Sequence, residues 1–378
     1  MNHSLRFAFL DSWHPDPGRG SGTAVGIAGL ARALESVGHR VEIIRPTRMG
    51  RGLASRILFN VSLRDRVTSD QIPDVVVGFD LDGFRWARRR PPGLPYVVAL
   101  KGIAADEARF ERSARQRWLL RTIAALERRN AASADRVLVP SRYSRQYAVD
   151  HYGIPVTKVE VVPEAIDLRP WRTLARRYRG EGARNRLRPP TILSVARQYP
   201  RKDTRALLRA MKIIAERHPT TRLTVIGGGP ELPQLRALSN ELALNHHVSF
   251  RGPVARDHEV RTAYFEADVF CLPSLQEGFG IVFVEAMAAG LPVVAARAGA
   301  VPEVVRHGRT GLLVPPSDPD ALAAALMSLL ENPEERQRLG AAGPRAAERY
   351  GLETVGRDLV RGIRSLVNAS RRGGPESR

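Results

Sequence analysis

The sequence is poor in cysteine and has no long apolar runs. Cys271 is the single cysteine among 378 residues, so no disulfide can form within the chain. It lies in a predicted buried strand, where a thiol packs as a small apolar side chain, and this usage fits a reducing, cytoplasmic setting. No apolar run approaches the roughly 20 residues that a helix needs to cross a bilayer. Residues 1–6 lead into a strand without the pattern of a secretory signal, so we expect a cytoplasmic protein.

Acidic side chains are outnumbered. The chain has 39 Asp and Glu residues against 59 Lys and Arg, which gives a formal net charge of +20. Arginine on solvated faces explains such an excess, and so does attraction to an anionic membrane surface. Nucleic acid is excluded as a partner, because the basic residues are spread along the chain and no nucleic-acid-binding motif accompanies them. A peripheral position on the inner face of a membrane stays open.

A pattern of strand, loop and helix begins twice. Leu5–Leu10 is a predicted strand, residues 11–22 form a loop, and Thr23–Val37 is an amphipathic helix. The same order starts again with a strand at Thr191 and a helix at Thr204–Arg217. A chain of this length exceeds what one core usually holds, so we predict an α/β protein with two Rossmann-like domains.

The predicted domain boundaries follow composition. The N-terminal domain comprises residues 1–168, and the C-terminal domain comprises residues 191–351. Residues 169–190 between them are rich in arginine, glycine and proline and are interpreted as a linker with room for one short helix. A final helix is expected at 352–368, followed by a disordered tail at 369–378.

The most informative stretch runs from Pro273 to Gly290, PSLQEGFGIVFVEAMAAG. It follows a predicted buried strand at 267–272, and a helix is expected from Ile281. A carboxylate and a glycine-rich loop therefore lie between a strand's carboxyl end and a helix's N-terminus, where ligands with phosphate bind. Glu285 comes eight residues after Glu277, about 12 Å along a helix. This separation is too long for two carboxyls on one scissile bond, so two contacts to one extended ligand fit better.

The string EGFGIVFVE, followed by AMAAGLPVVAARAGAVPEVV, resembles the E-x7-E signature of the retaining GT-B glycosyltransferases of the GT4 family. The resemblance covers most of the chain and is stronger in the C-terminal half. It implies two Rossmann-like domains that face each other across a cleft, one for the acceptor and one for the donor, with the C-terminal helix crossing back to the N-terminal domain. It also implies transfer of a sugar from a UDP or GDP sugar to an acceptor hydroxyl, with retention and without a metal or cofactor.

The resemblance assigns the chemistry to Arg197, Lys202 and Glu277. Arg197 and Lys202 would hold the donor's diphosphate and stabilise the charge that grows as it leaves. Glu277 would contact hydroxyls of the donor sugar. Glu285 would accept hydrogen bonds from the ribose, because a carboxylate offers two acceptor oxygens to a vicinal diol. The remaining predicted donor-binding residues are Phe279, Gly280, Ile281, Gly227, Gly228, Gly252 and Val254.

Five residues of the N-terminal half are predicted to line the acceptor or phosphate side. Gly20, Gly22 and Thr23 belong to a stretch that resembles the family's first glycine-rich loop. Lys101 stands where relatives often carry a histidine, so that histidine's role is not transferred to it. A lysine offers a positive contact to phosphate or acceptor but is a poor general acid or base at neutral pH. Glu164 follows the last predicted strand of this domain and is expected near the acceptor.

The basic, aromatic-bearing N-terminal domain favours a lipid-linked or cell-envelope glycan precursor over a small soluble acceptor. Two other functions stay open. One is another GT-B sugar-nucleotide chemistry, such as a 2-epimerase or a phosphorylase-like transfer, and turnover without an acceptor would favour it. The other is a non-catalytic sugar-nucleotide-binding protein, which tight donor binding without turnover would favour.

Overall fold

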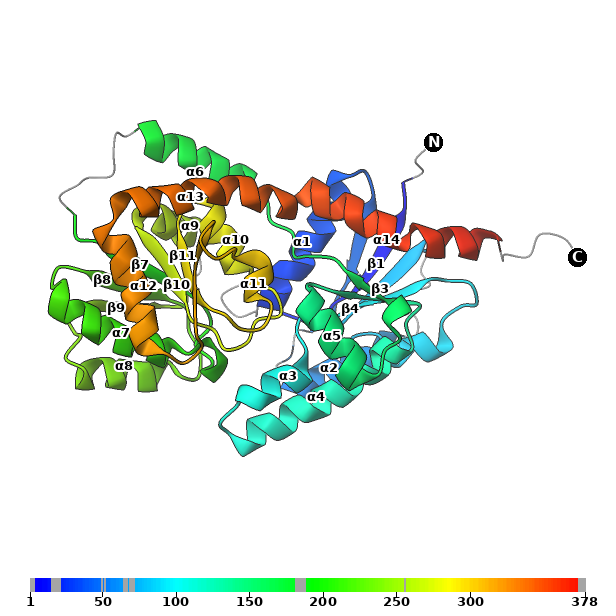
Figure 1. Ribbon diagram of the computed structural model, residues 1–378. Coiled ribbons are helices and arrows are strands. Elements are labelled where there is room, and N and C mark those ends of the chain that lie inside the picture. The colour runs from blue at the N-terminus through cyan, green and yellow to red at the C-terminus, as the bar shows by residue number, and fades with distance from the viewer. Residues whose placement is uncertain are drawn as a thin grey trace, which may run out of the picture. The chain divides into compact units, whose positions relative to one another are not determined.

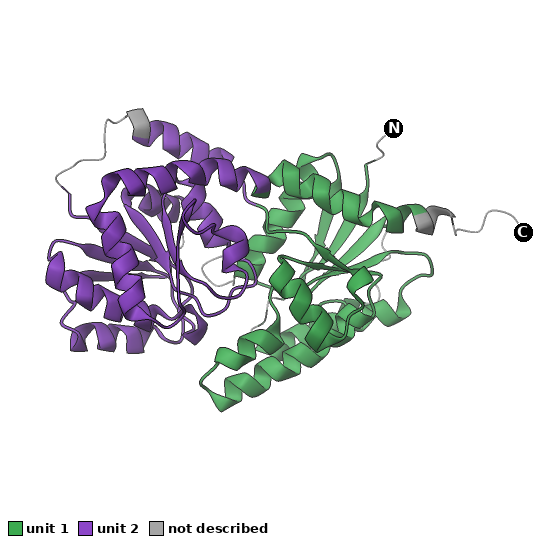
Figure 2. Ribbon diagram, viewed as in Figure 1, with its two compact units in different colours: residues 1–165, 350–378 green, residues 166–349 purple. Residues whose placement is uncertain are grey.

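A computed structural model describes most of the chain, namely residues 4–14, 22–48, 50, 52–63, 67, 72–180, 188–254 and 256–372. The protein divides into two compact units, shown in Figure 2. Unit 1 comprises residues 1–165 and 350–378, and unit 2 comprises residues 166–349. Each unit contains one six-stranded parallel sheet with helices on both faces (Figure 1).

The sheet of unit 1 has the strand order β2-β1-β3-β4-β5-β6. Its strands are β1 (Arg6–Leu10), β2 (Arg40–Ile44), β3 (Val75–Phe79), β4 (Tyr96–Ala99), β5 (Arg136–Val139) and β6 (Val159–Val161). Its helices are α1 (Gly22–Ser36), α2 (Gly52–Ser62), α3 (Ala104–Glu107), α4 (Ala114–Ala132), α5 (Arg142–Tyr152) and α14 (Leu352–Arg372). Apolar residues of α1 and α14 pack on one face of the sheet, and residues of α2, α4 and α5 pack on the other.

The sheet of unit 2 has the strand order β12-β11-β10-β7-β8-β9. Its strands are β7 (Thr191–Val195), β8 (Arg222–Ile226), β9 (Val248–Gly252), β10 (Val269–Leu272), β11 (Val293–Ala296) and β12 (Gly311–Val314). Its helices are α6 (Arg169–Gly180), α7 (Thr204–Arg217), α8 (Leu232–Glu241), α9 (Asp257–Glu266), α10 (Ile281–Ala288), α11 (Val301–Val304), α12 (Pro319–Glu331) and α13 (Pro333–Ala347). The central strands β10 and β11 are buried along their whole length, which explains their nearly continuous apolar sequences.

The predicted GT-B fold class is confirmed by these two parallel sheets. Cys271 is a buried free thiol in β10, as the apolar run around it predicted. The final helix belongs to unit 1 with the N-terminal half of the chain, because its apolar face packs along α1.

Two boundary segments differ in detail from the sequence-based expectation. Residues 169–180 of the expected linker form α6, which is part of unit 2 because Trp171 packs against the rings of Tyr264 and Phe265 in α9. Helix α14 extends to Arg372 and so includes residues 369–372 of the expected tail. The chain has no glycine or proline between 357 and 372 except Gly362, which leaves the helix without a strong stop signal there.

Candidate functional site

The strand order of unit 2 reverses direction at its centre. Strands β7 and β10 are neighbours, while the chain proceeds outward from β7 to β8 and from β10 to β11. In open α/β sheets, ligands bind outside the carboxyl ends of the strands at such a switch point. The loop after β7 carries Arg197 and Lys202, and the loop after β10 carries Glu277. The three residues predicted to be catalytic therefore belong to the two loops that meet at this point.

A buried ion pair joins the two loops. Lys202 Nζ donates to Glu277 Oε1 at 2.5 Å, and Ser274 Oγ donates to the same oxygen at 2.8 Å. Burial raises the pKa of Glu277, but the charges of Lys202 and Arg201 and the two hydrogen bonds outweigh it, so this pKa lies below its ordinary value. The carboxyl group is therefore ionised at neutral pH and fixed in place.

Residues that the sequence did not single out support this pair. Arg201 Nε donates to Gln276 Oε1 at 3.1 Å, and the Leu275 amide donates to the Arg201 carbonyl at 2.8 Å. The guanidinium groups of Arg197 and Arg201 lie 5.6 and 5.2 Å from the centre of the Tyr199 ring, within the range of cation–π contacts. The position of Ser274, three residues before Glu277, is a sequence signal that could have identified it.

The predicted glycines bring the neighbouring loops close together. Gly227 has φ +123°, and a Cβ atom there would overlap the carbonyl oxygen of Ala196. Its amide donates to the Gly252 carbonyl at 2.8 Å, and the Gln198 amide donates to the Gly228 carbonyl at 2.9 Å. The loops after β7, β8 and β9 therefore form one backbone assembly. Val254, two residues beyond Gly252, is half-buried on the last of these loops.

Helix α10 begins directly after the loop that carries Glu277. Gly280 has φ +87° and precedes the helix, and Phe279 beside it is buried. Ile281 is the first helical residue, so its amide is among those at the helix N-terminus that can face an anion. Phe279, Gly280 and Ile281, which are predicted to bind the donor, therefore lie together where the loop enters helix α10.

Glu285 lies one helical turn further along α10 and has a different environment. Its Oε2 accepts a hydrogen bond from the Tyr264 hydroxyl at 2.8 Å. Burial raises the pKa of Glu285 to about 7, against the lowering effect of the Tyr264 hydrogen bond. The two glutamates of the E-x7-E string thus have separate partners and opposite pKa shifts. This arrangement matches two separate contacts better than a pair acting on one bond.

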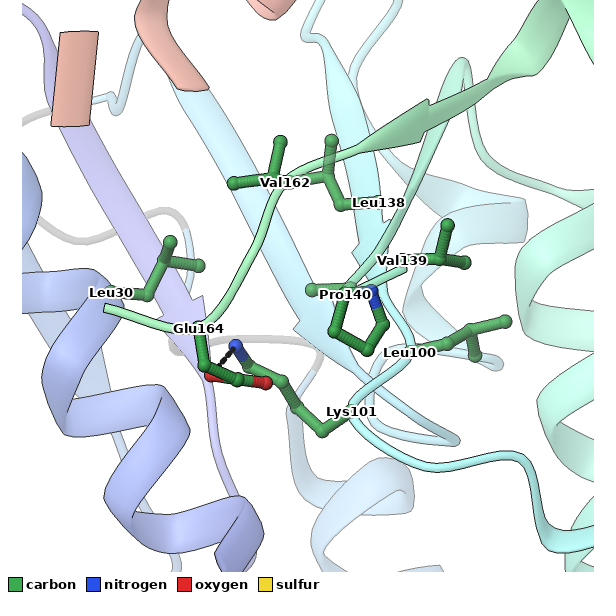
Figure 3. A pocket seen from close by; sticks show the side chains of 9 residues that line it. Leu30, Leu100, Lys101, Leu138, Val139, Pro140, Val162 and Glu164 are labelled. Atoms are coloured by element: carbon green, nitrogen blue, oxygen red, sulfur yellow. Dashed lines mark hydrogen bonds and ion pairs between the residues drawn. The ribbon is translucent and has the colours of Figure 1, made fainter. Parts of the chain in front are cut away.

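The predicted acceptor-side residues of unit 1 form a second buried ion pair. Lys101 follows β4 and Glu164 follows β6, and their side chains point toward each other across a small cavity in Figure 3. Lys101 Nζ donates to Glu164 Oε2 at 2.8 Å, with side-chain exposures of 6% and 10%. A Cβ atom on Gly26 of α1 would overlap that carboxylate, so a larger residue there would require the Glu164 side chain to move.

Of the three residues predicted for the first glycine-rich loop, the structure describes two. Gly22 and Thr23 form the first turn of α1, while Gly20 lies outside the described residues. Within the described residues, no helix is long and apolar enough to cross a bilayer.

Known proteins resemble both units. Residues 181–346 match the family described as Glycosyl transferases group 1, and residues 20–169 match Glycosyltransferase Family 4. A GDP-mannose-dependent alpha-(1-6)-phosphatidylinositol monomannoside mannosyltransferase of Mycobacterium tuberculosis is 35% identical over 242 residues, which are 60% of this chain. The match spans 60% of the length of that relative.

A second relative and a solved structure extend the match. A D-inositol 3-phosphate glycosyltransferase of Thermomonospora curvata is 32% identical over 307 residues, covering 76% of this chain and 70% of the relative. The structure of a sucrose-phosphate synthase from Thermosynechococcus elongatus superposes with a TM-score of 0.79 at 22% identity, covering 97% of this chain and 100% of the other. At that identity the structural likeness concerns the fold.

Proposed function

Because this chain belongs to glycosyltransferase family 4, among the group 1 glycosyltransferases, we propose that it moves a sugar from a nucleoside diphosphate sugar to an acceptor hydroxyl. The observation that carries the proposal is the Lys202–Glu277 pair at the switch point of unit 2. It presents a cation and an ionised carboxylate side by side, one suited to a diphosphate and the other to sugar hydroxyls.

The cations act on the leaving group. Cleavage of the bond between the sugar and the diphosphate leaves negative charge on a phosphate oxygen, and Lys202 and Arg197 stabilise that charge as it develops. We propose that these fixed cations take the place of a metal ion. Transfer then needs neither a divalent cation nor an organic cofactor, and EDTA leaves the rate unchanged.

The proposed transfer retains the anomeric configuration. The acceptor hydroxyl attacks the anomeric carbon from the face that the diphosphate leaves, and a phosphate oxygen of the leaving group takes the hydroxyl proton. Glu277 is not the nucleophile in this scheme, because the acceptor hydroxyl attacks the anomeric carbon directly. Its role is to accept hydrogen bonds from the donor sugar.

The names of the relatives suggest which substrates to test first. The mycobacterial relative is named for GDP-mannose and a phosphatidylinositol mannoside, and the other is named for inositol 3-phosphate. We therefore propose GDP-mannose as the first donor, UDP sugars as the second, and an inositol-containing glycolipid or its phosphorylated headgroup as the acceptor.

A lipid-linked acceptor requires access to a membrane, and unit 1 has side chains suited to that contact. Leu58 and Val61 of α2 are 70% and 48% exposed. Trp118 of α4 is 68% exposed, and the exposed Arg115 and Arg121 lie one turn before and after it. Apolar and aromatic side chains with arginines beside them suit an anionic bilayer surface. Flotation with vesicles that contain anionic lipid should recover the protein, and vesicles of neutral lipid alone should not.

Nucleotide binding is the first test of the proposed function. Thermal unfolding is measured with GDP, UDP, ADP and their sugar conjugates, with and without EDTA. A ligand at about 100 times its dissociation constant adds about 2.7 kcal/mol of stability. Stabilisation by GDP or UDP that EDTA leaves unchanged, followed by sugar transfer to an acceptor, supports the proposal. Conversion of the donor without an acceptor would instead indicate an epimerase, and binding without any turnover would indicate a binding protein.

A further inference from the structure

We propose that Tyr264 is a positioning residue for nucleotide recognition, holding the Glu285 carboxylate in the orientation and charge state that binds the ribose diol. This inference rests on the proposed function, because it takes the ligand of unit 2 to be a nucleoside diphosphate. The hydroxyl of Tyr264 donates to Glu285 Oε2 at 2.8 Å. Within the described residues, no second hydrogen-bond donor to this carboxyl is found, so Tyr264 alone fixes its orientation and leaves Oε1 available.

The ring of Tyr264 cannot swing away from this position. Tyr264 is fully buried in α9. Its ring centre lies 5.3 Å from that of Trp171 in α6, edge to face, and 5.5 Å from that of Phe270 in β10, stacked. Three elements of unit 2 thus hold the ring, and a phenol clamped in this way aims its hydroxyl in one direction.

The hydrogen bond from Tyr264 also affects whether the Glu285 carboxyl is ionised at neutral pH. The pKa of Glu285 is raised to about 7, because burial and the charge of Asp257 raise it by more than the Tyr264 hydrogen bond and the charge of Arg261 lower it. These groups all belong to α9, where Arg261 is paired with Asp257. An ionised carboxylate accepts hydrogen bonds from both hydroxyls of a diol, whereas the protonated form has lost acceptor capacity. Nucleotide affinity should therefore rise as the pH rises through about 7. Loss of the tyrosine hydroxyl should move that rise to higher pH.

The test is calorimetric binding of GDP and UDP by the full chain between about pH 5.5 and 8.5. Tyr264→Phe keeps the ring and removes the hydroxyl. We expect about tenfold weaker binding at neutral pH, since a hydrogen bond to a charged group is lost, and a midpoint shifted to higher pH. Glu285→Gln removes this titrating group, so its remaining pH dependence reports the nucleotide phosphate and all other titrating groups and is subtracted from the other profiles.

A matched control exists in unit 1. Tyr152 donates to Glu127 Oε2 at 2.7 Å, so Tyr152→Phe removes a comparable buried hydrogen bond between tyrosine and glutamate. This variant should lose stability but keep the wild-type pH profile of nucleotide binding, which separates a positioning role from general destabilisation.

The outcomes distinguish the inference from the proposed function. A Tyr264→Phe protein with wild-type affinity and midpoint overturns the positioning role, while nucleotide binding by the wild type preserves the proposed function. A wild-type protein that binds no nucleotide at any pH overturns both. If Tyr264→Phe does not fold, the Glu285 carboxyl is titrated by carbon NMR in the wild type. Its pKa should fall when GDP or UDP is added, and an unchanged titration overturns the inference.

Discussion

Each unit contains a buried lysine–glutamate pair near the carboxyl ends of its sheet, but the two pairs have different settings. Lys202 and Glu277 lie on the loops after β7 and β10, the two strands between which the order of unit 2 reverses. Lys101 and Glu164 follow β4 and β6, to one side of the corresponding reversal between β1 and β3. The local chemistry is the same, and the position in the topology differs.

The switch point of unit 1 carries a network of buried hydrogen bonds among its own side chains. The carboxylate of Asp82 accepts hydrogen bonds from Ser12, from Asn60 and from Arg56 of α2. Arg56 also lies 4.4 Å above the centre of the Trp13 ring. Side chains of α2 and of the described part of the loop after β1 thus bond to the loop that follows β3. Of the two buried pairs, the pair of unit 2 is the one that lies on the loops at a switch point, where ligands bind in open α/β sheets.

The largest expected effect is on turnover. Lys202→Ala removes the cation that we propose faces the leaving diphosphate, so kcat should fall about 1000-fold, equivalent to about 4 kcal/mol of transition-state stabilisation. The measurement is the initial rate of sugar transfer at saturating donor, with folding checked by circular dichroism. The control is Lys212→Ala, which removes a half-exposed lysine whose pair with Glu216 lies on the surface of α7. A Lys202→Ala enzyme that is as active as this control would contradict the assigned role.

The next effect is on stability. Lys101→Met leaves the buried Glu164 carboxylate without its counter-charge, which should cost about 3 kcal/mol of unfolding free energy. Denaturant unfolding measures this loss, and combining the change with Glu164→Gln should recover part of it. If Lys101→Met instead keeps its stability and loses transferase activity, the pair of unit 1 acts on a ligand as that of unit 2 does, and the distinction between the units fails.

Per unit of pH, the smallest expected effect is a difference in the pH dependence of stability. Burial raises the pKa of Glu127 in unit 1 to about 8, so the folded protein keeps a proton that the unfolded chain has released. Stability from this group is full below pH 4.5, the ordinary glutamate value, and is lost as the pH rises toward about 8. The pKa of Glu277 is lowered, so its contribution is present above that ordinary value and is lost as the pH falls below it.

Two variants separate these contributions. Glu127→Gln should flatten the fall in the free energy of unfolding between about pH 5 and 8. The change corresponds to one proton, or at most about 1.4 kcal/mol per pH unit. Glu277→Gln should leave that slope unchanged and reduce the loss on the acid side. Identical slopes in the Glu127→Gln and wild-type proteins would contradict the assignment of this proton to Glu127.

The sequence was most informative where chemistry and local structure coincide. The stretch around Glu277 predicted a strand, a glycine-rich loop and a helix, and these are β10, the loop that follows it, and α10. The residues that support the site were harder to find. Ser274 could have been found from its position three residues before Glu277. Tyr264 could not, because nothing in the residues beside it in α9 shows that the Glu285 carboxylate, 21 residues away, accepts its hydroxyl.

The sequence alone determined that two βα domains form and which loops carry cations, carboxylates and glycines, because strand and helix periodicity and turn chemistry are local properties. The tertiary structure decided which of these groups pair. Lys202 and Glu277 are 75 residues apart, Lys101 and Glu164 are 63 apart, and Tyr264 and Glu285 are 21 apart. Strand order brings such groups together, and burial then sets whether each carboxyl keeps or releases its proton. Both depend on the packing of the whole unit.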